Sequence, residues 1–320
     1  MIRVIELFSG ISAVRKALIN CNYDFEIVDS IEIDKYAIKS YNALYNTNEI
    51  PKDITNYYPN KKEIGDIDLI WNSSPCTDIS LVGKQAGAEQ GSGTRSSLIY
   101  ETFRIIEEIK PKYVIWENVR NLSRGKHKRI LDDYIGKLDT LGYRSYYQVL
   151  NASDYGIPQS RERIFVVSIR KDLQKGFVFP NKQKLSKTVH DYLESNVDDK
   201  YYLSNKMIDY IRAVGTENFH NKDSRINLKI ARPLTTIPNK RAGTTNYICS
   251  SLPFEYDLQQ LGESYPRIRR MTPRESWLLM GFSNDDFDKV KDTNSDTQLY
   301  KQAGNSVVVN VIMAILKNLL

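Results

Sequence analysis

The stretch RVIELFSGISAVRKAL, residues 3–18, joins a short apolar run to a helical pattern through a polar turn that contains Gly10. The run RVIELF has the length of a strand, and Ile11, Val14 and Leu18 share one face of a helix. This stretch therefore predicts the first strand, turn and helix of an α/β fold.

The same alternation continues along the first half of the chain. Strand-like and helical runs follow one another at IVDSIEI, KYAIKSYNAL, IDLIWN, SLIYETFRIIEEI, KYVIWE and RILDDYIGKL, and further strand-like runs stand at YYQVL and IFVVSI. Strands that alternate with helices of this length predict an α/β protein with a Rossmann-like, doubly wound, mainly parallel sheet.

The pattern breaks after Arg170, where LSKTVHDYLE and NKMIDYIRAV predict short helices among turn-rich stretches such as NKRAGTTNY. Helical patterns return at TPRESWLLMGF and at NSVVVNVIMAILKNLL, whose apolar density fits a helix that packs back onto the sheet. We therefore expect a main domain over residues 1–170, a smaller irregular domain over residues 171–268 and a returning segment over residues 269–320.

The composition favours a cytoplasmic enzyme without metal. No apolar run approaches the roughly 18 residues of a membrane span, and the start MIRVIELFSG lacks the features of a signal peptide. Cys21, Cys76 and Cys249 are odd in number and widely spaced, which predicts neither a disulfide framework nor a cysteine-pair metal site.

The positive charge is concentrated in the irregular region. The chain carries a net charge of +6, and residues 170–270 alone hold 18 Lys and Arg against 11 Asp and Glu. A basic segment beside a neutral body suggests a polyanion that is bound through phosphates. On charge alone, a solvated lysine-rich surface explains the excess equally well.

The first turn has the features of a cofactor site. Glu32 ends the second predicted strand 22 residues after Gly10. In doubly wound folds an acidic residue at about this distance can hold ribose hydroxyls, so the pair suits an adenosine-containing cofactor. The complete G-x-G-x-x-G motif of dinucleotide sites is absent, and an ordinary tight turn is the alternative.

Cys76 stands in SSPCTDIS, residues 73–80, directly after the predicted strand IDLIWN. Open α/β sheets bind ligands at the carboxyl ends of their strands, where a thiolate would be a good nucleophile. Its polar neighbours argue against a buried inert thiol. The glycine-rich stretch GKQAGAEQGSGTR that follows cannot pack as core and predicts a lid or a plain loop.

Three charged residues complete the candidate site. Glu117 interrupts the apolar run of the fourth predicted strand, where it could act as an acid, although a surface glutamate is the commoner case. Arg161 and Arg163 alternate at the start of the run IFVV, so we expect both guanidinium groups to point toward the cleft of Glu117.

These motifs together resemble the DNA (cytosine-5) methyltransferase family. The resemblance is ordered and covers nearly the whole chain, through LFSGIS, IEIDKYA, KDIT, SSPCTDIS, TRSSLIYETFRII, WENVRNL, LNASDYGIPQSRERIFVV, RRMTPRESWLLMGF and KQAGNSVVVNVI. It implies a catalytic domain that binds S-adenosylmethionine and, between IFVVSIR and RRMTPRE, a target-recognition domain that coincides with the basic segment.

The resemblance also implies site residues. The residues implied to bind S-adenosylmethionine are Phe8, Gly10, Glu32, Asp53, Ile54, Pro75, Asn305 and Ser306. Cys76 would be the nucleophile, Glu117 the partner of cytosine N3 and Arg163 the contact to O2, with Arg161 bracing the site. A DNA-binding lid would include Ser80, Gly83, Lys84, Gln85 and Arg95.

The implied chemistry needs no metal. A thiolate that adds at cytosine C6 makes C5 nucleophilic enough to attack the sulfonium methyl group, after which the C5 proton and the thiol leave. Because C6 is hidden in stacked DNA, the base must be flipped out of the duplex. The chain departs from the family pattern at Ser12, at Thr77 and at Ser73 and Ser74, where glycine, glutamine and small glycine-type residues respectively are common.

Two other functions compete with this one. A branch of the family methylates tRNA, but it usually carries a Cys-Phe-Thr signature, whereas Ser250 follows Cys249 here. A catalytically silent DNA-binding relative is disfavoured because Cys76, Glu117, Arg161 and Arg163 are all present. We expect a monomer that acts on double-stranded DNA in a restriction-modification or phage setting, with any cognate endonuclease encoded separately.

Overall fold

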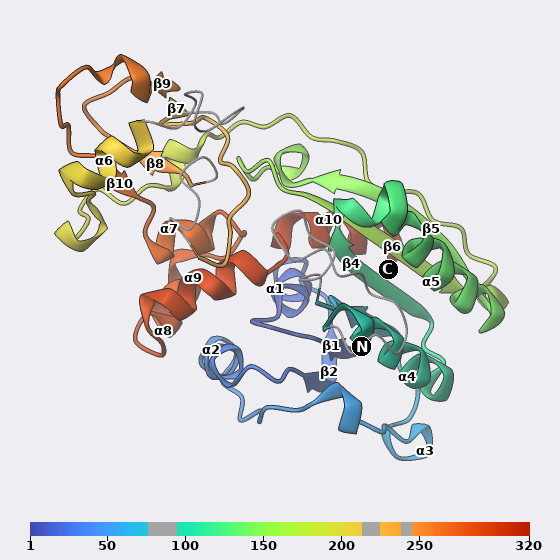
Figure 1. The fold of residues 1–320 in the computed structure, drawn as a ribbon. Coiled ribbons are helices and arrows are strands. Elements are labelled where there is room, and N and C mark those ends of the chain that lie inside the picture. Colours follow the sequence, from blue (N-terminus) through green and yellow to red (C-terminus); the bar gives the residue numbers. More distant parts are fainter. Residues whose placement is uncertain (76–94, 213–224, 238–244) are drawn as a thin grey trace. The chain divides into compact units, whose positions relative to one another are not determined.

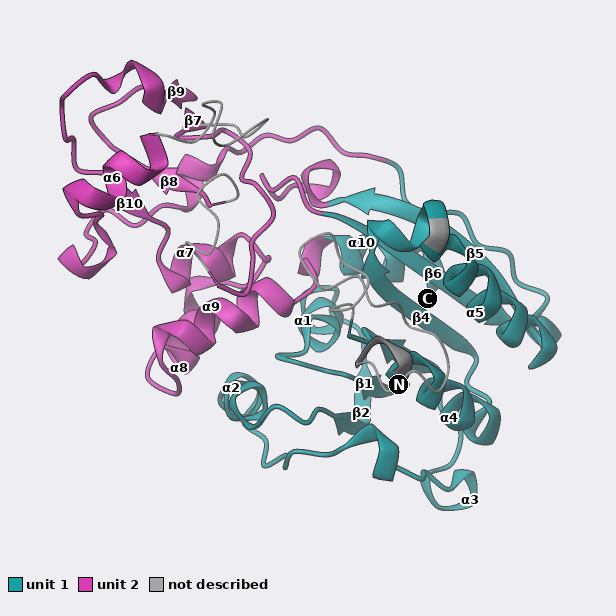
Figure 2. Cartoon of the chain, in the orientation of Figure 1, with its two compact units in different colours: residues 1–151, 162–181, 311–320 teal, residues 152–161, 182–310 magenta. Residues whose placement is uncertain are grey.

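The computed structural model describes residues 1–75, 95–212, 225–237 and 245–320 (Figure 1). The chain forms two compact units (Figure 2). Unit 1 contains residues 1–151, 162–181 and 311–320, and unit 2 contains residues 152–161 and 182–310. Compactness therefore groups residues 269–310 with the irregular region, whereas the functional division into residues 1–170, 171–268 and 269–320 stays a prediction.

Unit 1 is built on a six-stranded sheet in the order β2-β1-β3-β4-β6-β5. The first four strands in that order pair in parallel, and β6 runs antiparallel to both β4 and β5. The predicted α/β class with a mainly parallel sheet is thus confirmed. The strands are β1 (Ile2–Leu7), β2 (Phe25–Ile31), β3 (Leu69–Asn72), β4 (Tyr113–Val119), β5 (Tyr143–Asn151) and β6 (Glu162–Arg170).

The longer helices of unit 1 are amphipathic and cover a sheet that is buried on both faces. Alternate strand residues such as Ile5, Trp116 and Val166 form one core cluster with α4 and α5. Their neighbours Val4 and Ile115, which point to the opposite face, are also fully buried. The helices are α1 (Ala13–Asn20), α2 (Lys35–Tyr45), α3 (Lys61–Ile64), α4 (Glu101–Ile109) and α5 (Lys128–Thr140).

Unit 2 has little regular structure and a core of its own. Its elements are α6 (Asn205–Arg212), α7 (Pro273–Leu278), α8 (Asn284–Val290), α9 (Asp296–Asn305) and the short strands β7 (Arg225–Ile226), β8 (Tyr247–Ile248), β9 (Tyr256–Asp257) and β10 (Arg269–Arg270). The strands pair as β7–β9 and β8–β10. Ile208, Ile226, Tyr247, Cys249 and Ile268 contribute to one buried cluster. Cys249 is therefore a core residue.

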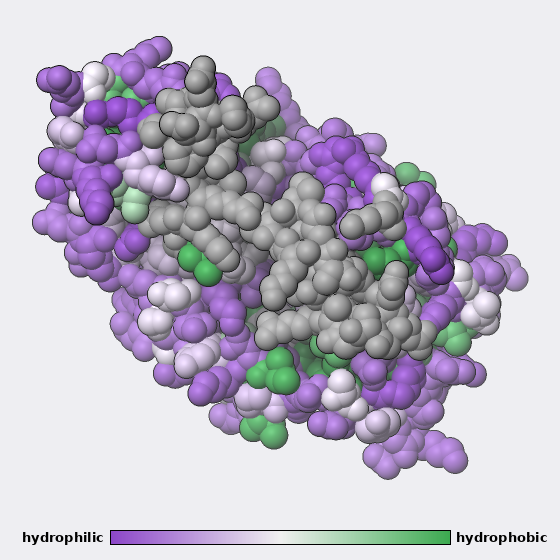
Figure 3. Space-filling model, viewed as in Figure 1, coloured by the Kyte–Doolittle hydropathy of each residue, from purple (hydrophilic) through white to green (hydrophobic). Residues whose placement is uncertain are grey.

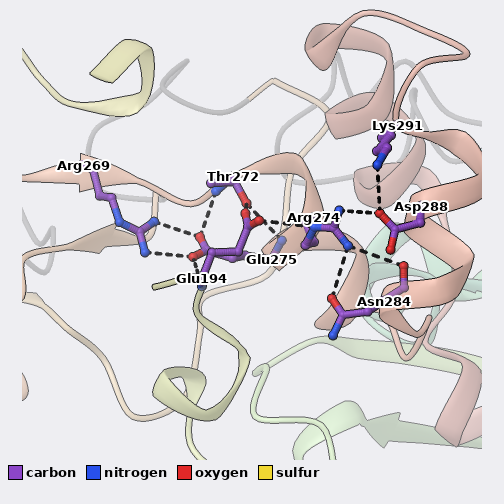
Figure 4. Close-up of polar contacts among 8 residues, drawn as sticks. All are labelled: Glu194, Arg269, Thr272, Arg274, Glu275, Asn284, Asp288 and Lys291. Carbon is purple, nitrogen blue, oxygen red and sulfur yellow. Dashed lines mark hydrogen bonds and ion pairs between the residues drawn. The ribbon is translucent and has the colours of Figure 1, made fainter. Parts of the chain in front are cut away.

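A polar network holds α7 in place within unit 2 (Figure 4). The Arg269 guanidinium donates to both carboxylate oxygens of Glu275 at 2.8 Å, and the Glu275 side chain is completely buried. The same carboxylate accepts the N–H of Thr272, whose hydroxyl caps the helix in return. One buried carboxylate thus satisfies both a buried cation and a helix N-terminus.

One window of the described residues, Asp296–Leu319, is long and apolar enough by composition to cross a membrane. Of this window, 67% is buried inside the protein, as is usual for the core helix of a globular protein. The window is also interrupted between α9 and α10 (Val309–Leu319). The window contains Asn305, Asn310 and Lys317, so it is not an uninterrupted apolar run. Among the described residues, the face shown in Figure 3 is mostly hydrophilic and carries small hydrophobic patches.

Candidate active site

Three strands of unit 1 end at one edge of the sheet, and their ends carry the candidate residues. Phe8 follows β1, Ser73 follows β3 and Glu117 lies near the end of β4. Because these strands are parallel, their carboxyl ends share an edge. Strand β6 runs the other way, so its first residues, Glu162 and Arg163, reach the same edge.

The turn after β1 has an unusual backbone. Phe8, Gly10 and Ser12 have φ angles of 56°, 55° and 52°, in the left-handed region. No atom of the residues that the structure describes lies within 4 Å of the position of a Cβ at Gly10. The N–H of Gly10 donates to Glu32 Oε2 at 2.9 Å, and the N–H of Asp34 donates to Glu32 Oε1 at 2.8 Å. The turn is thus tied to the predicted ribose-binding carboxylate, and burial raises the pKa of Glu32.

The predicted adenine-binding segment is joined to this carboxylate. The N–H of Lys52 donates to the Glu32 carbonyl at 2.7 Å. Asp53 accepts the Thr55 N–H at 3.0 Å and starts a short 3₁₀ helix, Ile54–Asn56. Arg104 of α4 donates to the Ile54 carbonyl at 3.2 Å. Unit 1 therefore brings Gly10, Glu32, Asp53 and Ile54 into one connected region.

A buried polar cluster that sequence reasoning missed supports the turn. Glu6 of β1 is completely buried, and the Ser12 hydroxyl donates to its carboxylate while accepting the N–H of Arg15. Arg15 also donates to the Tyr41 hydroxyl at 2.9 Å. Burial raises the pKa of Glu6 to about 7, although the Ser12 hydrogen bond and Arg15 oppose the shift. An acid inside the apolar run RVIELF was the available signal.

The residues before Cys76 are fixed by hydrogen bonds. The Ser73 hydroxyl donates to the Phe8 carbonyl at 3.0 Å. The Ser74 hydroxyl accepts the indole N–H of Trp116 at 3.0 Å, and Asn118 donates to the Ser74 carbonyl at 3.1 Å. Both serines, which depart from the family pattern, thus join the end of β3 to its neighbouring strands.

The predicted nucleophile and most of the predicted lid residues lie outside the described residues. Cys76, Ser80, Gly83, Lys84 and Gln85 belong to this group. Pro75 is half-buried at the boundary. Arg95 begins a 3₁₀ helix, Arg95–Tyr100, of which only the backbone is described at that position.

Glu117 and Arg163 are brought together as an ion pair. The Arg163 Nε lies 3.2 Å from Glu117 Oε1, and the carboxylate is buried whereas the arginine side chain is 21% exposed. The pair forms because Arg163 is opposite Val119 in the antiparallel β4–β6 ladder, and Val119 shares a strand face with Glu117. The backbone carbonyl of Glu162 accepts a further Arg163 hydrogen bond at 2.8 Å.

Arg161 has a different environment from Arg163. It directly precedes β6 and is grouped with unit 2, and the expectation that Arg161 and Arg163 point to one cleft stays a prediction. Its buried guanidinium donates to the carbonyls of Leu234, Gly304 and Ser306 at 3.0, 2.8 and 2.8 Å. Asn305, at the end of α9, is exposed, and Ser306 is half-buried. Arg161 thus contacts the turn that contains the two residues predicted to bind the methionine end of the cofactor.

Among the residues that the structure describes, no group of three His, Cys, Asp or Glu side chains could hold a metal ion.

The chain is similar to known proteins over nearly its whole length. A family profile described as C-5 cytosine-specific DNA methylase matches residues 2–320. The chain is 35% identical to the type II methyltransferase M2.ScrFI of Lactococcus lactis subsp. cremoris, over 100% of this chain and 99% of that protein. It is 33% identical to M.HhaI of Haemophilus parahaemolyticus, over 99% and 94%.

A solved structure shares the fold. A mutant form of DNMT2 from Spodoptera frugiperda superposes with a TM-score of 0.79 at 21% identity, over 100% of this chain and 99% of that one. At this identity the likeness concerns the fold alone.

Proposed function

The chain belongs to the family of C-5 cytosine-specific DNA methylases, and on this premise we propose that Cys76 is the nucleophile that activates the target cytosine. The family acts on DNA and uses S-adenosylmethionine. This chain is therefore a DNA cytosine-5 methyltransferase, and its site residues, partners and setting are the matters proposed here.

The turn after β1 fits the adenosine part of S-adenosylmethionine. Each carboxylate oxygen of Glu32 accepts one backbone N–H and keeps a second lone pair for a ribose hydroxyl. The open space at Gly10 lets a ligand reach the backbone. Phe8, Asp53, Ile54 and Pro75 would complete this part of the site, and Asn305 and Ser306 of unit 2 would take the methionine end. The cofactor supplies an electrophilic methyl group on its sulfonium.

The reaction proceeds by nucleophilic addition and elimination. The Cys76 thiolate forms a bond to C6 of a flipped cytosine while Glu117 shares a proton with N3 and Arg163 donates to O2. Electron density moves to C5, which attacks the methyl group. A base then removes the C5 proton, and the electrons of that bond expel the thiolate from C6 and restore the aromatic ring.

The Glu117–Arg163 pair is the observation that most favours this role. Two groups that face N3 and O2 of one pyrimidine edge must lie within a few ångströms of each other, and here they are 3.2 Å apart at the sheet edge where Pro75 leads from β3 toward Cys76. Mutual pairing also holds both side chains in place before the base arrives, which lowers the cost of ordering them.

The DNA-reading region, the location and the oligomeric state are proposed from the charge distribution and from the family resemblance. Residues 171–268 and their basic side chains would read a short duplex sequence, with the glycine-rich segment after Cys76 closing over the flipped base. The enzyme would act in the cytoplasm as a monomer that protects DNA, with any cognate endonuclease encoded separately. A tRNA substrate is less well supported, because Ser250 and Ser251 follow Cys249 where the tRNA branch usually carries Phe and Thr.

The proposal is tested by expressing the gene from a plasmid in a host without cytosine methylation, followed by bisulfite sequencing of the plasmid. Protected cytosines in one short sequence context are expected with the wild type. They should be absent with Cys76→Ser, which keeps the size of the side chain but not the thiolate. Complete conversion of both plasmids would contradict DNA methylation by Cys76, and unchanged protection with Cys76→Ser would contradict its role as the nucleophile.

A further inference from the structure

Residues 158–161 of unit 2 run beside residue 231. The N–H of Ser160 donates to the Ala231 carbonyl at 2.8 Å, and the N–H of Ala231 donates to the Pro158 carbonyl at 2.8 Å. This pairing brings the segment that leads into β6 against the start of residues 232–237, hereafter the recognition segment.

The first residue of the recognition segment is fixed by a side chain outside it. The N–H of Arg232 donates to Asn246 Oδ1 at 2.8 Å, and Asn246 Nδ2 donates to the Arg232 carbonyl at 3.1 Å. The Asn246 amide therefore replaces the backbone partner that Arg232 would have in a β-ladder. Residues 232 and 246 are held together at this point.

Gln159 and Arg161 both bind Leu234, the third residue of the recognition segment. The completely buried Gln159 amide accepts the Leu234 N–H at 3.0 Å and donates to the Leu279 carbonyl at 2.8 Å. Arg161 donates to the Leu234 carbonyl at 3.0 Å. A pocket lined in part by Leu234 and Thr235 lies beside the segment, so packing on that side does not fix its position. Hydrogen bonds from Gln159 and Arg161 do so instead.

The other end of the Arg161 guanidinium binds residues 304–306. Its Nη2 donates at 2.8 Å to both the Gly304 and the Ser306 carbonyls. A Cβ at Gly304 would lie 2.5 Å from the backbone of Thr235 and Thr236, so the recognition segment and this turn are in direct backbone contact. One guanidinium thus joins the recognition segment to the turn of Asn305 and Ser306.

We propose that Arg161 is a positioning residue that couples recognition of the DNA sequence by residues 232–237 to binding of the methionine end of the cofactor at residues 304–306. The inference rests on the proposed function, in which these two segments bind DNA and cofactor. A planar fork with several N–H groups can hold three carbonyls at once, which the single ammonium of lysine cannot do in the same geometry. Because binding coupling is reciprocal, ordering of either segment by its ligand favours the other.

The test measures the Kd of the duplex that bisulfite mapping identifies, with and without saturating S-adenosylhomocysteine. In the wild type this product should tighten DNA binding on the order of tenfold. Arg161→Lys should bring this ratio to about one, and should also reduce the preference for the mapped duplex over one with a single changed base pair. Gly304→Ala, which forces the recognition segment and the turn apart, should have the same effect.

Arg3→Lys is the matched control, because the Arg3 guanidinium also donates to two backbone carbonyls, those of Ile64 and Asp66, but both belong to unit 1. It should keep the wild-type ratio. A purely structural role of Arg161 would weaken binding or lower the Tm with the ratio unchanged, which would overturn the inference, as would a wild-type ratio of one. Failure of the wild type to methylate DNA would instead contradict the proposed function.

Discussion

At the scale of single residues, the turn after β1 depends on a serine in a conformation that favours glycine. Ser12 has a φ of 52°, for which a residue with a Cβ carries a cost of about 1 kcal/mol. Its hydroxyl offsets this cost by accepting the Arg15 N–H and by donating to Glu6. The presence of Ser12 and Glu6 can be read from the sequence, but their contact cannot, because it depends on how the turn folds back over β1.

The raised pKa of Glu6 predicts a specific pH dependence of stability. The pKa is about 7 in the folded protein against a reference value of 4.5, so the folded state binds the proton more tightly than the unfolded state does. This contribution is complete below about pH 4.5 and is lost as the pH rises through about 7, which amounts to roughly 3 kcal/mol.

Glu6→Gln removes the titration and keeps the size of the side chain. The free energy of unfolding of the variant relative to wild type should therefore increase by roughly 3 kcal/mol between about pH 4.5 and about pH 8. Urea denaturation at several pH values measures the difference, and Glu26→Gln serves as a control at the half-buried edge of the sheet. A difference that does not change with pH would show that Glu6 does not titrate in this range.

At the scale of elements, the sequence predicts where helices and strands lie better than it predicts which elements pair with one another. The alternation of apolar runs with helical patterns predicts the strands and helices of unit 1, and the pattern TPRESWLLMGF predicts the helix α7. The antiparallel direction of β6 could not be predicted, since both directions are compatible with a buried apolar run. The hydrogen-bond partners of Arg161 could not be predicted either, because they are the carbonyls of residues 234, 304 and 306, which are distant in the sequence.

The buried pair that supports α7 can be tested by a double-mutant cycle. Arg269→Met should cost about 3–5 kcal/mol in the free energy of unfolding, because it leaves the Glu275 carboxylate buried without its cation. The double variant Arg269→Met/Glu275→Leu should cost less than the sum of the single variants, since no uncompensated charge remains. Additive costs would mean that the two side chains are not coupled.

At the scale of the whole molecule, residues from distant parts of the chain build each unit. Residues 152–161 belong to unit 2 although they stand between two strands of unit 1. No periodicity signals this, because it depends on the backbone pairing of residue 231 with residues 158–160. The basic character of residues 170–270 was visible in the sequence and supports DNA binding by that region. The pairing of Glu117 with Arg163 agrees with the sequence-based expectation that both residues serve one cleft.

The most direct test of the account is covalent trapping at Cys76. The purified enzyme is incubated with S-adenosylmethionine and the mapped duplex carrying 5-fluorocytosine at the target position, since fluorine cannot leave as a proton does and the final elimination stops. Peptide mass spectrometry should find the methylated fluorocytosine attached to the peptide that contains Cys76, and no adduct with Cys76→Ser. Methylation of ordinary DNA without such an adduct, or an adduct on another residue, would contradict the central role of Cys76.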